Sequence, residues 1–151
     1  MNTNKFIVLA TSLLLSVGNM NAQSQDIPVF KDGDRVVFVG NSITCGGHYH
    51  SYIWLYYMTH FPNMRVEMFN EGVGGDDAGL MLKRLDKVFE HKPTVLTLTF
   101  GMNDTGYMDF TLPDNQEKGH NNVVTACNSY EKIEKIYKQH SDVSKILIGG
   151  S

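Results

Sequence analysis

The chain has 151 residues, a length that suits one domain. Apolar residues make up 42% of the sequence and charged residues 19%, which is ordinary for a globular protein. The formal net charge of −3 argues against a nucleic acid as partner, because binding to phosphates needs a basic surface.

The first 22 residues differ from the rest of the chain. Lys5 precedes an apolar run from Phe6 to Val17, which is too short to cross a bilayer as a helix of about 20 residues. A polar stretch ending in Ala22 follows, and this layout predicts a secretory signal peptide over residues 1–22. The alternative is a buried N-terminal helix or strand. We expect an exported protein, periplasmic or secreted, with a lead-in over residues 23–34, a domain over residues 35–151 and no membrane span after cleavage.

Strands and helices are predicted to alternate along the remaining chain. Short apolar runs predict strands over residues 35–40, 65–69 and 94–100, and a fourth strand begins at 145 and continues to 148. Helices are predicted over 51–61, from Asp76 or Asp77 to Pro93, and from about Asn122 to about His140. This order predicts a parallel sheet with helices on both faces, whose reactive groups gather at the carboxyl ends of the strands.

The loops after the first three strands contain residues that can stabilise a developing anion. Ser42 lies where backbone N–H groups point outward, so it is a candidate nucleophile or simply a helix N-cap. The glycine-rich segment 72–77 can approach a ligand closely or form a tight turn before a capped helix. Asn103 can donate to an oxyanion or form an Asx turn.

Taken together, these loops resemble the first three sequence blocks of the SGNH hydrolases, also called GDSL-like esterases or lipases. The matching segments are GNSIT at 40–44, GVGGD at 72–76 and GMND at 101–104, with GNS in place of the GDS of the first block. The resemblance extends from about Arg35 to the last residue. It implies an α/β fold, a flavodoxin-like three-layer α/β/α sandwich with a parallel sheet, and no metal or organic cofactor.

The resemblance also implies a role for individual residues. Ser42 matches the nucleophile, and the oxyanion donors match the backbone N–H groups of Ser42 and Gly75 and the side chain of Asn103. The residues that we expect to support them are Gly40, Asn41, Gly101 and Asp104.

One part of the family pattern is missing from this sequence. The family activates its serine with a histidine from a D-x-x-H motif near the C-terminus, and a serine hydroxyl is a poor nucleophile without such a base. None of the six histidines stands three positions after an aspartate; they are His48, His50, His60, His91, His120 and His140. We therefore expect a C-terminally incomplete SGNH domain that lacks the last strand and helix, as in a piece of a longer enzyme.

Two further groups of residues have more than one interpretation. His48 and His50 are expected in a loop that lines the mouth of the site, although an extended H-x-H segment could also suit a metal. The aromatic residues Trp54, Tyr56 and Tyr57 are expected in the core of a helix rather than in a sugar-binding platform. Cys45 and Cys127 could form a disulfide after export, but they give no zinc signal.

The sequence thus predicts an exported serine carboxylic-ester hydrolase that works through an acyl-enzyme. The expected substrate is a small-molecule or glycan ester. The favoured reaction is the removal of acetyl groups from a carbohydrate. Because the D-x-x-H motif is absent, the alternative is a non-catalytic binding protein of the same fold, or an inactive truncated relic. The oligomeric state stays open.

Overall fold

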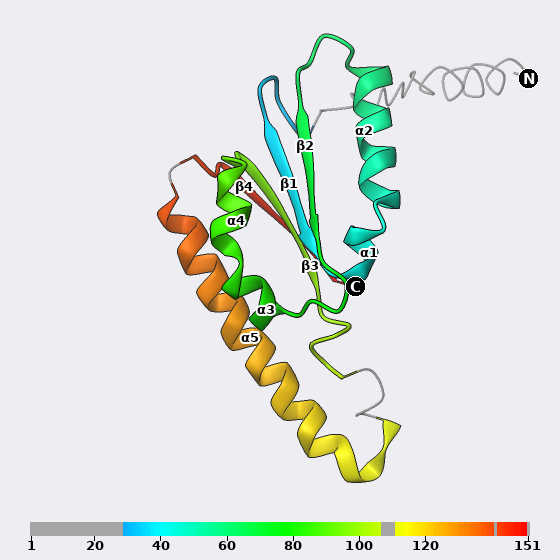
Figure 1. The fold of residues 1–151 in the computed structure, drawn as a ribbon, viewed down its shortest axis with the longest axis vertical. Coiled ribbons are helices and arrows are strands. Elements are labelled where there is room, and N and C mark those ends of the chain that lie inside the picture. Colours follow the sequence, from blue (N-terminus) through cyan, green and yellow to red (C-terminus); the bar gives the residue numbers. More distant parts are fainter. Residues whose placement is uncertain (1–28, 107–110, 141, 151) are drawn as a thin grey trace, which may run out of the picture.

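A computed structural model describes residues 29–106, 111–140 and 142–150, in which the strands form one parallel sheet (Figure 1). The four strands are β1 (Arg35–Gly40), β2 (Glu67–Gly72), β3 (Val95–Phe100) and β4 (Lys145–Gly150). Their order across the sheet is β2-β1-β3-β4, and every pairing is parallel. The expected parallel α/β fold is therefore confirmed.

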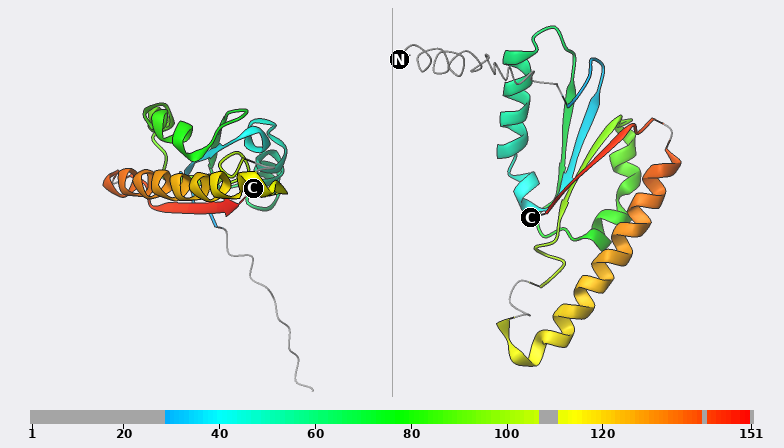
Figure 2. Two further views of the ribbon diagram at one scale, coloured as in Figure 1. Left: turned by 90° about the horizontal axis from the view of Figure 1, so that it is seen from below. Right: turned by 180° about the vertical axis from the view of Figure 1, so that it is seen from behind.

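Helices cover both faces of this sheet. Helices α1 (Ser42–Cys45) and α2 (His48–His60) lie on one side, and α3 (Ala78–Lys83), α4 (Leu85–Glu90) and α5 (Gln116–Gln139) lie on the other (Figure 2). A short 3-10 helix, Pro113–Asn115, leads into α5. The three layers follow from the alternation of strands and helices, because each helix must cross back over the sheet to reach the next parallel strand.

Two apolar cores hold the layers together. Alternate residues of the central strands face opposite sides, so Val37, Val39, Leu96 and Leu98 pack under α3, α4 and α5. Val36, Phe38 and Val95 pack instead against Tyr57 of α2, with Phe30 beside them. All seven strand residues are at most 1% exposed, as expected for strands that are buried on both faces.

Several element boundaries differ from the predicted ones. Strand β2 begins at Glu67 and includes Asn70 and Glu71, whereas the apolar pattern predicts 65–69. The helix predicted before Pro93 is broken at Arg84 into α3 and α4. Helix α5 begins at Gln116, six residues before the predicted start. Its first turns extend beyond the carboxyl ends of the strands, where no sheet lies beneath them to require an apolar stripe (Figure 1).

The aromatic residues of α2 are less buried than predicted. Tyr57 is buried, but Trp54 is 47% exposed and Tyr56 39% exposed. The expectation of a core position is therefore wrong for these two, because only one side of α2 contacts the sheet.

The two cysteines are both free and exposed, so the disulfide alternative is not realised. Among the described residues, no helix is long and apolar enough to cross a membrane. The segment predicted as a signal peptide lies outside the described residues.

Candidate functional site

Three loops meet at the carboxyl edge of the sheet, where β1, β2 and β3 end side by side. The register pairs Gly40 with Gly72 and with Thr99, so the segments that follow start at the same level. The backbone N–H of Val73 donates to the carbonyl oxygen of Gly40 at 2.9 Å and joins the second loop to the first.

Ser42 is the first residue of α1, immediately after the end of β1, and it is exposed. The N-cap is Asn41, whose side-chain oxygen accepts from the N–H of Ile43 at 3.0 Å. The interpretation of Ser42 as an N-cap is therefore wrong. No hydrogen bond of the Ser42 hydroxyl to another described residue is found, so this group is available to a ligand.

Two glycines allow α1 to lie close against the strand ends. A Cβ at Gly72 would lie 2.1 Å from the backbone nitrogen of Cys45, and a Cβ at Gly40 would lie 2.0 Å from Oγ1 of Thr44. Such approaches are possible only without a side chain. The position of Ser42 above the sheet edge thus depends on both glycines.

The second loop places Gly75 at its exposed tip. Gly75 has φ +78°, a backbone conformation that favours glycine. Asp76 turns inward and is 3% exposed, and Asp77 caps α3 by accepting from the N–H of Leu80 at 2.8 Å. The loop is thus a turn before a capped helix, as one interpretation predicts, and it also presents a glycine backbone beside the first loop.

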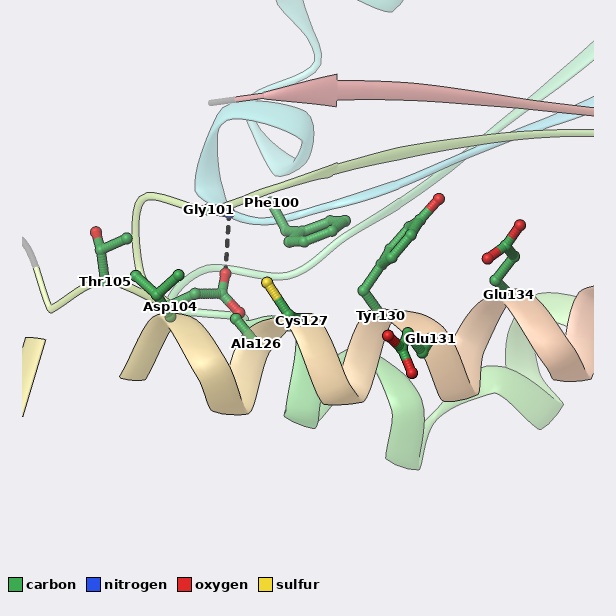
Figure 3. Close-up of a pocket in the computed structure, with 10 residues that line it drawn as sticks. Phe100, Gly101, Asp104, Thr105, Ala126, Cys127, Tyr130, Glu131 and Glu134 are labelled. Carbon is green, nitrogen blue, oxygen red and sulfur yellow. Dashed lines mark hydrogen bonds between the residues drawn. The ribbon is translucent and has the colours of Figure 1, made fainter. Parts of the chain in front are cut away.

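Two side chains of the third loop form hydrogen bonds with the second loop and with the start of α3. The amide nitrogen Nδ2 of Asn103 donates to the carbonyl oxygen of Asp76 at 2.6 Å. The carboxylate of Asp104 accepts from the N–H of Ala78 at 2.8 Å. It also accepts from the N–H of Gly101 at 2.9 Å, the bond drawn in Figure 3. The side chain of Asn103 therefore contacts the second loop instead of folding back on its own.

Behind the loops lies an ion pair that the sequence pattern does not predict. Arg84 contacts the carboxylate of Asp76, with its Nη2 at 2.6 Å and its Nε at 2.7 Å from Oδ2. Burial raises the pKa of Asp76, while the hydrogen bond and charge of Arg84 act to lower it. The sequence signal for this pair is weak: Arg84 stands at helical spacing from the apolar residues Met81 and Val88.

None of the histidines is bonded to Ser42 in the described part of the chain. His48 is exposed on α2, and His50 stacks on Phe38 with Nε2 3.1 Å from the carbonyl oxygen of Thr44. The expected loop at the mouth of the site is thus a helix, and the extended H-x-H alternative does not occur. Over the described residues, no group of three or more His, Cys, Asp or Glu could hold a metal ion.

An apolar cavity of about 560 Å³ opens beside the third loop, between the end of β3 and α5 (Figure 3). Phe100 and Tyr130 both line it and stack on each other, with ring centroids 5.5 Å apart. Gly101 and Asp104 of the third loop are among the residues that line this cavity.

The sequence of residues 38–147 matches the GDSL-like Lipase/Acylhydrolase family. The chain belongs to this family. No curated protein matches it.

Solved structures of similar fold include a gut microbial diltiazem-metabolizing enzyme, with 48% identity and a TM-score of 0.76 over 83% of this chain and 28% of that one. An acetylxylan esterase from Geobacillus stearothermophilus is 18% identical, with a TM-score of 0.67 over 79% of this chain and 60% of that one. Solved catalytic mutants of that esterase replace an aspartate, a histidine and a serine. The chain spans less than two thirds of the length of either protein.

Proposed function

We propose that the protein is a serine carboxylic-ester hydrolase with Ser42 as its nucleophile. The observation that carries this proposal is the meeting of three loops at one sheet edge in a chain of the acylhydrolase family. An exposed serine hydroxyl, a glycine N–H and an asparagine amide come from these three loops.

The geometry suits acyl transfer. The Ser42 hydroxyl attacks the acyl carbon, its proton passes to a general base, and the carbonyl oxygen becomes an oxyanion. The N–H groups of Ser42 and Gly75 and the amide of Asn103 stabilise this charge. The alcohol leaves with a proton from the base, and water then attacks the acyl-enzyme, which releases the acid and restores the serine.

The orientation of Asn103 follows from its hydrogen bond. A side-chain amide has two N–H donors, and one of them is engaged by the carbonyl oxygen of Asp76 at 2.6 Å. This bond fixes the plane of the amide, so the second N–H has a defined direction before the substrate arrives. A donor that needs no rearrangement stabilises the transition state most effectively.

We place the general base outside the described residues, in a D-x-x-H segment of the full-length protein. This assignment is supported by the share of the similar structures that the chain covers, which is 28% of the diltiazem-metabolizing enzyme and 60% of the acetylxylan esterase. Within the described ranges, no histidine is bonded to Ser42. The catalytic aspartate and histidine of the acetylxylan esterase are consistent with it.

We propose an acetylated carbohydrate as the substrate class. The support comes from the acetylxylan esterase of similar fold. Diltiazem, which carries an acetyl ester, is a second probe because an enzyme that metabolises it is 48% identical to this chain. The predicted signal peptide supports export, and a mature N-terminus near Gln23 in the secreted protein would test it.

The test of the proposal compares two serine variants of the full-length protein. Ser42→Ala should abolish the hydrolysis of p-nitrophenyl acetate and the release of acetate from acetylated xylan. Ser51→Ala is the matched control, because this exposed serine of α2 lies outside the three loops. More than a few per cent of wild-type activity in Ser42→Ala would rule out the proposed nucleophile.

A non-catalytic binding protein is the second candidate, since Ser42 has no histidine partner among the described residues. In that case the full-length protein would bind acetylated xylo-oligosaccharides in calorimetry without releasing acetate. Neither the wild-type protein nor Ser42→Ala would then show turnover.

A further inference from the structure

The helix break at Arg84 brings an arginine side chain behind the second loop. Arg84 ends α3 and begins α4 with φ −114° and ψ 13°, which is not a helical conformation. Its side chain is 15% exposed, and its Nη2 donates to the backbone carbonyl oxygen of Glu71 at 2.8 Å. The guanidinium therefore lies between the end of β2 and the loop that follows it.

Asp76 connects this arginine to both proposed oxyanion donors of the later loops. Its carboxylate accepts from Arg84, its carbonyl oxygen accepts from Nδ2 of Asn103 at 2.6 Å, and its N–H donates to the carbonyl oxygen of Val73 at 3.2 Å. It also follows Gly75 directly in the chain, so the orientation of the Gly75 peptide depends on where Asp76 is held.

The contact between Arg84 and Asp76 is close and largely buried. Two nitrogens of Arg84 contact one oxygen of a carboxylate whose side chain is 4% exposed. Asp77 and Asp104 lie near enough to repel a charge on Asp76, and burial also disfavours that charge. Without Arg84 the Asp76 carboxylate would be buried without a counterion, which is unfavourable. We expect Asp76 to move toward water, and this movement would displace its backbone carbonyl group as well.

We propose that Arg84 is a positioning residue for ester hydrolysis. It holds Asp76 so that the Gly75 N–H and the Asn103 amide converge on the oxyanion. This inference rests on the proposed function and adds to it a residue that touches neither substrate nor nucleophile.

If Arg84 only stabilised the fold, a change elsewhere in its hydrogen-bond network would lower kcat equally. The contacts of Arg84 with Glu71 and His91 allow this alternative to be tested. Glu71 accepts from Nη1 of Arg84 at 3.3 Å and pairs with Nε2 of His91 at 2.7 Å. His91 also stacks on Phe69 of β2, with ring centroids 4.5 Å apart. His91→Gln therefore weakens this network without touching Asp76, and it serves as the matched control.

The experiment measures kcat and KM for p-nitrophenyl acetate in the full-length protein. Arg84→Met should lower kcat about tenfold to a hundredfold, because two preorganised donors lose their alignment. KM should change less than threefold, since the charge develops only in the transition state. Arg84→Lys, which keeps the charge but not the paired contact, should recover part of kcat, and His91→Gln should keep at least half of it.

Two results would overturn the inference. One is a folded Arg84→Met variant with wild-type kcat, and the other is an equal loss of kcat in Arg84→Met and His91→Gln. If circular dichroism shows that Arg84→Met does not fold, Arg84→Lys replaces it in the test. A wild-type kcat in Arg84→Lys, or a loss of kcat equal to that of His91→Gln, would then overturn the inference. Ser42→Ala separates this inference from the proposed function: if that variant is inactive while Arg84→Met is unaffected, the function stands and the role of Arg84 falls.

Discussion

Asn103 is the side chain whose chemical role is most specific. Its amide contacts the second loop at 2.6 Å and is proposed to donate its other N–H to the oxyanion. Asn103→Ala should therefore lower kcat about 10²–10³-fold, with a smaller change in KM, because one oxyanion donor is lost. The exposed Asn121 of α5 provides the control Asn121→Ala. An unchanged kcat in steady-state assays of Asn103→Ala would refute the role.

Tyr137 is a buried residue whose hydroxyl makes no hydrogen bond to the described residues. It is 1% exposed. Tyr137→Phe should therefore leave the free energy of unfolding unchanged or raise it by about 1 kcal/mol, since no bond is lost. Tyr52→Phe, at a position that is 72% exposed, is the control.

Burial also raises the pKa of Tyr137 above its usual value of about 10. Its folded form thus stays protonated where the unfolded form ionises, so wild-type stability should fall as the pH rises above about 10. Below that pH the group contributes its full stability. Tyr137→Phe should lose less stability over the same range in urea titrations, and parallel curves for the two proteins would contradict this account.

At the scale of elements, the docking of α1 on the strand ends decides where the nucleophile lies. A Cβ at Gly72 would meet the backbone of Cys45 at 2.1 Å, so α1 must move if this glycine is replaced. Gly72→Ala should cost about 1–3 kcal/mol of stability and lower kcat as Ser42 shifts. Gly149→Ala, whose Cβ would lie 3.7 Å from the nearest atom, is the control. Equal stability and activity in the two variants would contradict the docking.

The sequence predicts buried elements better than half-exposed ones. Strands β1 and β3 are predicted within one residue, because their apolar β-branched runs are buried on both faces. Strand β2 is predicted too early, since the carboxylate of its polar residue Glu71 pairs with Arg84 and His91, which lie 13 and 20 residues further along the chain. The break between α3 and α4 is missed for the same reason: Arg84 turns inward toward charges that no local pattern reveals.

The loops of the candidate site are found from the sequence because they follow strands of a parallel sheet. That rule brings Ser42, Gly75 and Asn103 to one edge, and the register of β1 with β2 and β3 agrees with it. The ion pair behind them is not predictable, since a contact between Arg84 and Asp76 depends on the tertiary fold. The placement of His48 and His50 in a loop is wrong because α2 begins earlier than the apolar pattern indicates.

For the molecule as a whole, residues 1–151 on their own should hydrolyse acetyl esters far more slowly than the full-length protein. The described residues provide a serine and oxyanion donors but no histidine bonded to that serine. Such a site retains about 10³–10⁴-fold acceleration over water, far below a working enzyme. We also expect aggregation, because Ile148 on β4 is 59% exposed and β4 pairs only with β3 in the described sheet. Light scattering and acetyl-ester assays of this piece and the full-length protein would check both expectations.

The most direct test of Ser42 as the nucleophile is to locate a covalent inhibitor adduct on the chain. The full-length protein is treated with a fluorophosphonate, which forms a stable adduct on an activated serine, and its tryptic peptides are analysed by tandem mass spectrometry. We predict one adduct, on Ser42 within the tryptic peptide of residues 36–65, together with loss of esterase activity and no labelling of Ser42→Ala. An adduct on Ser51 or another residue, or full activity after Ser42 is labelled, would contradict it.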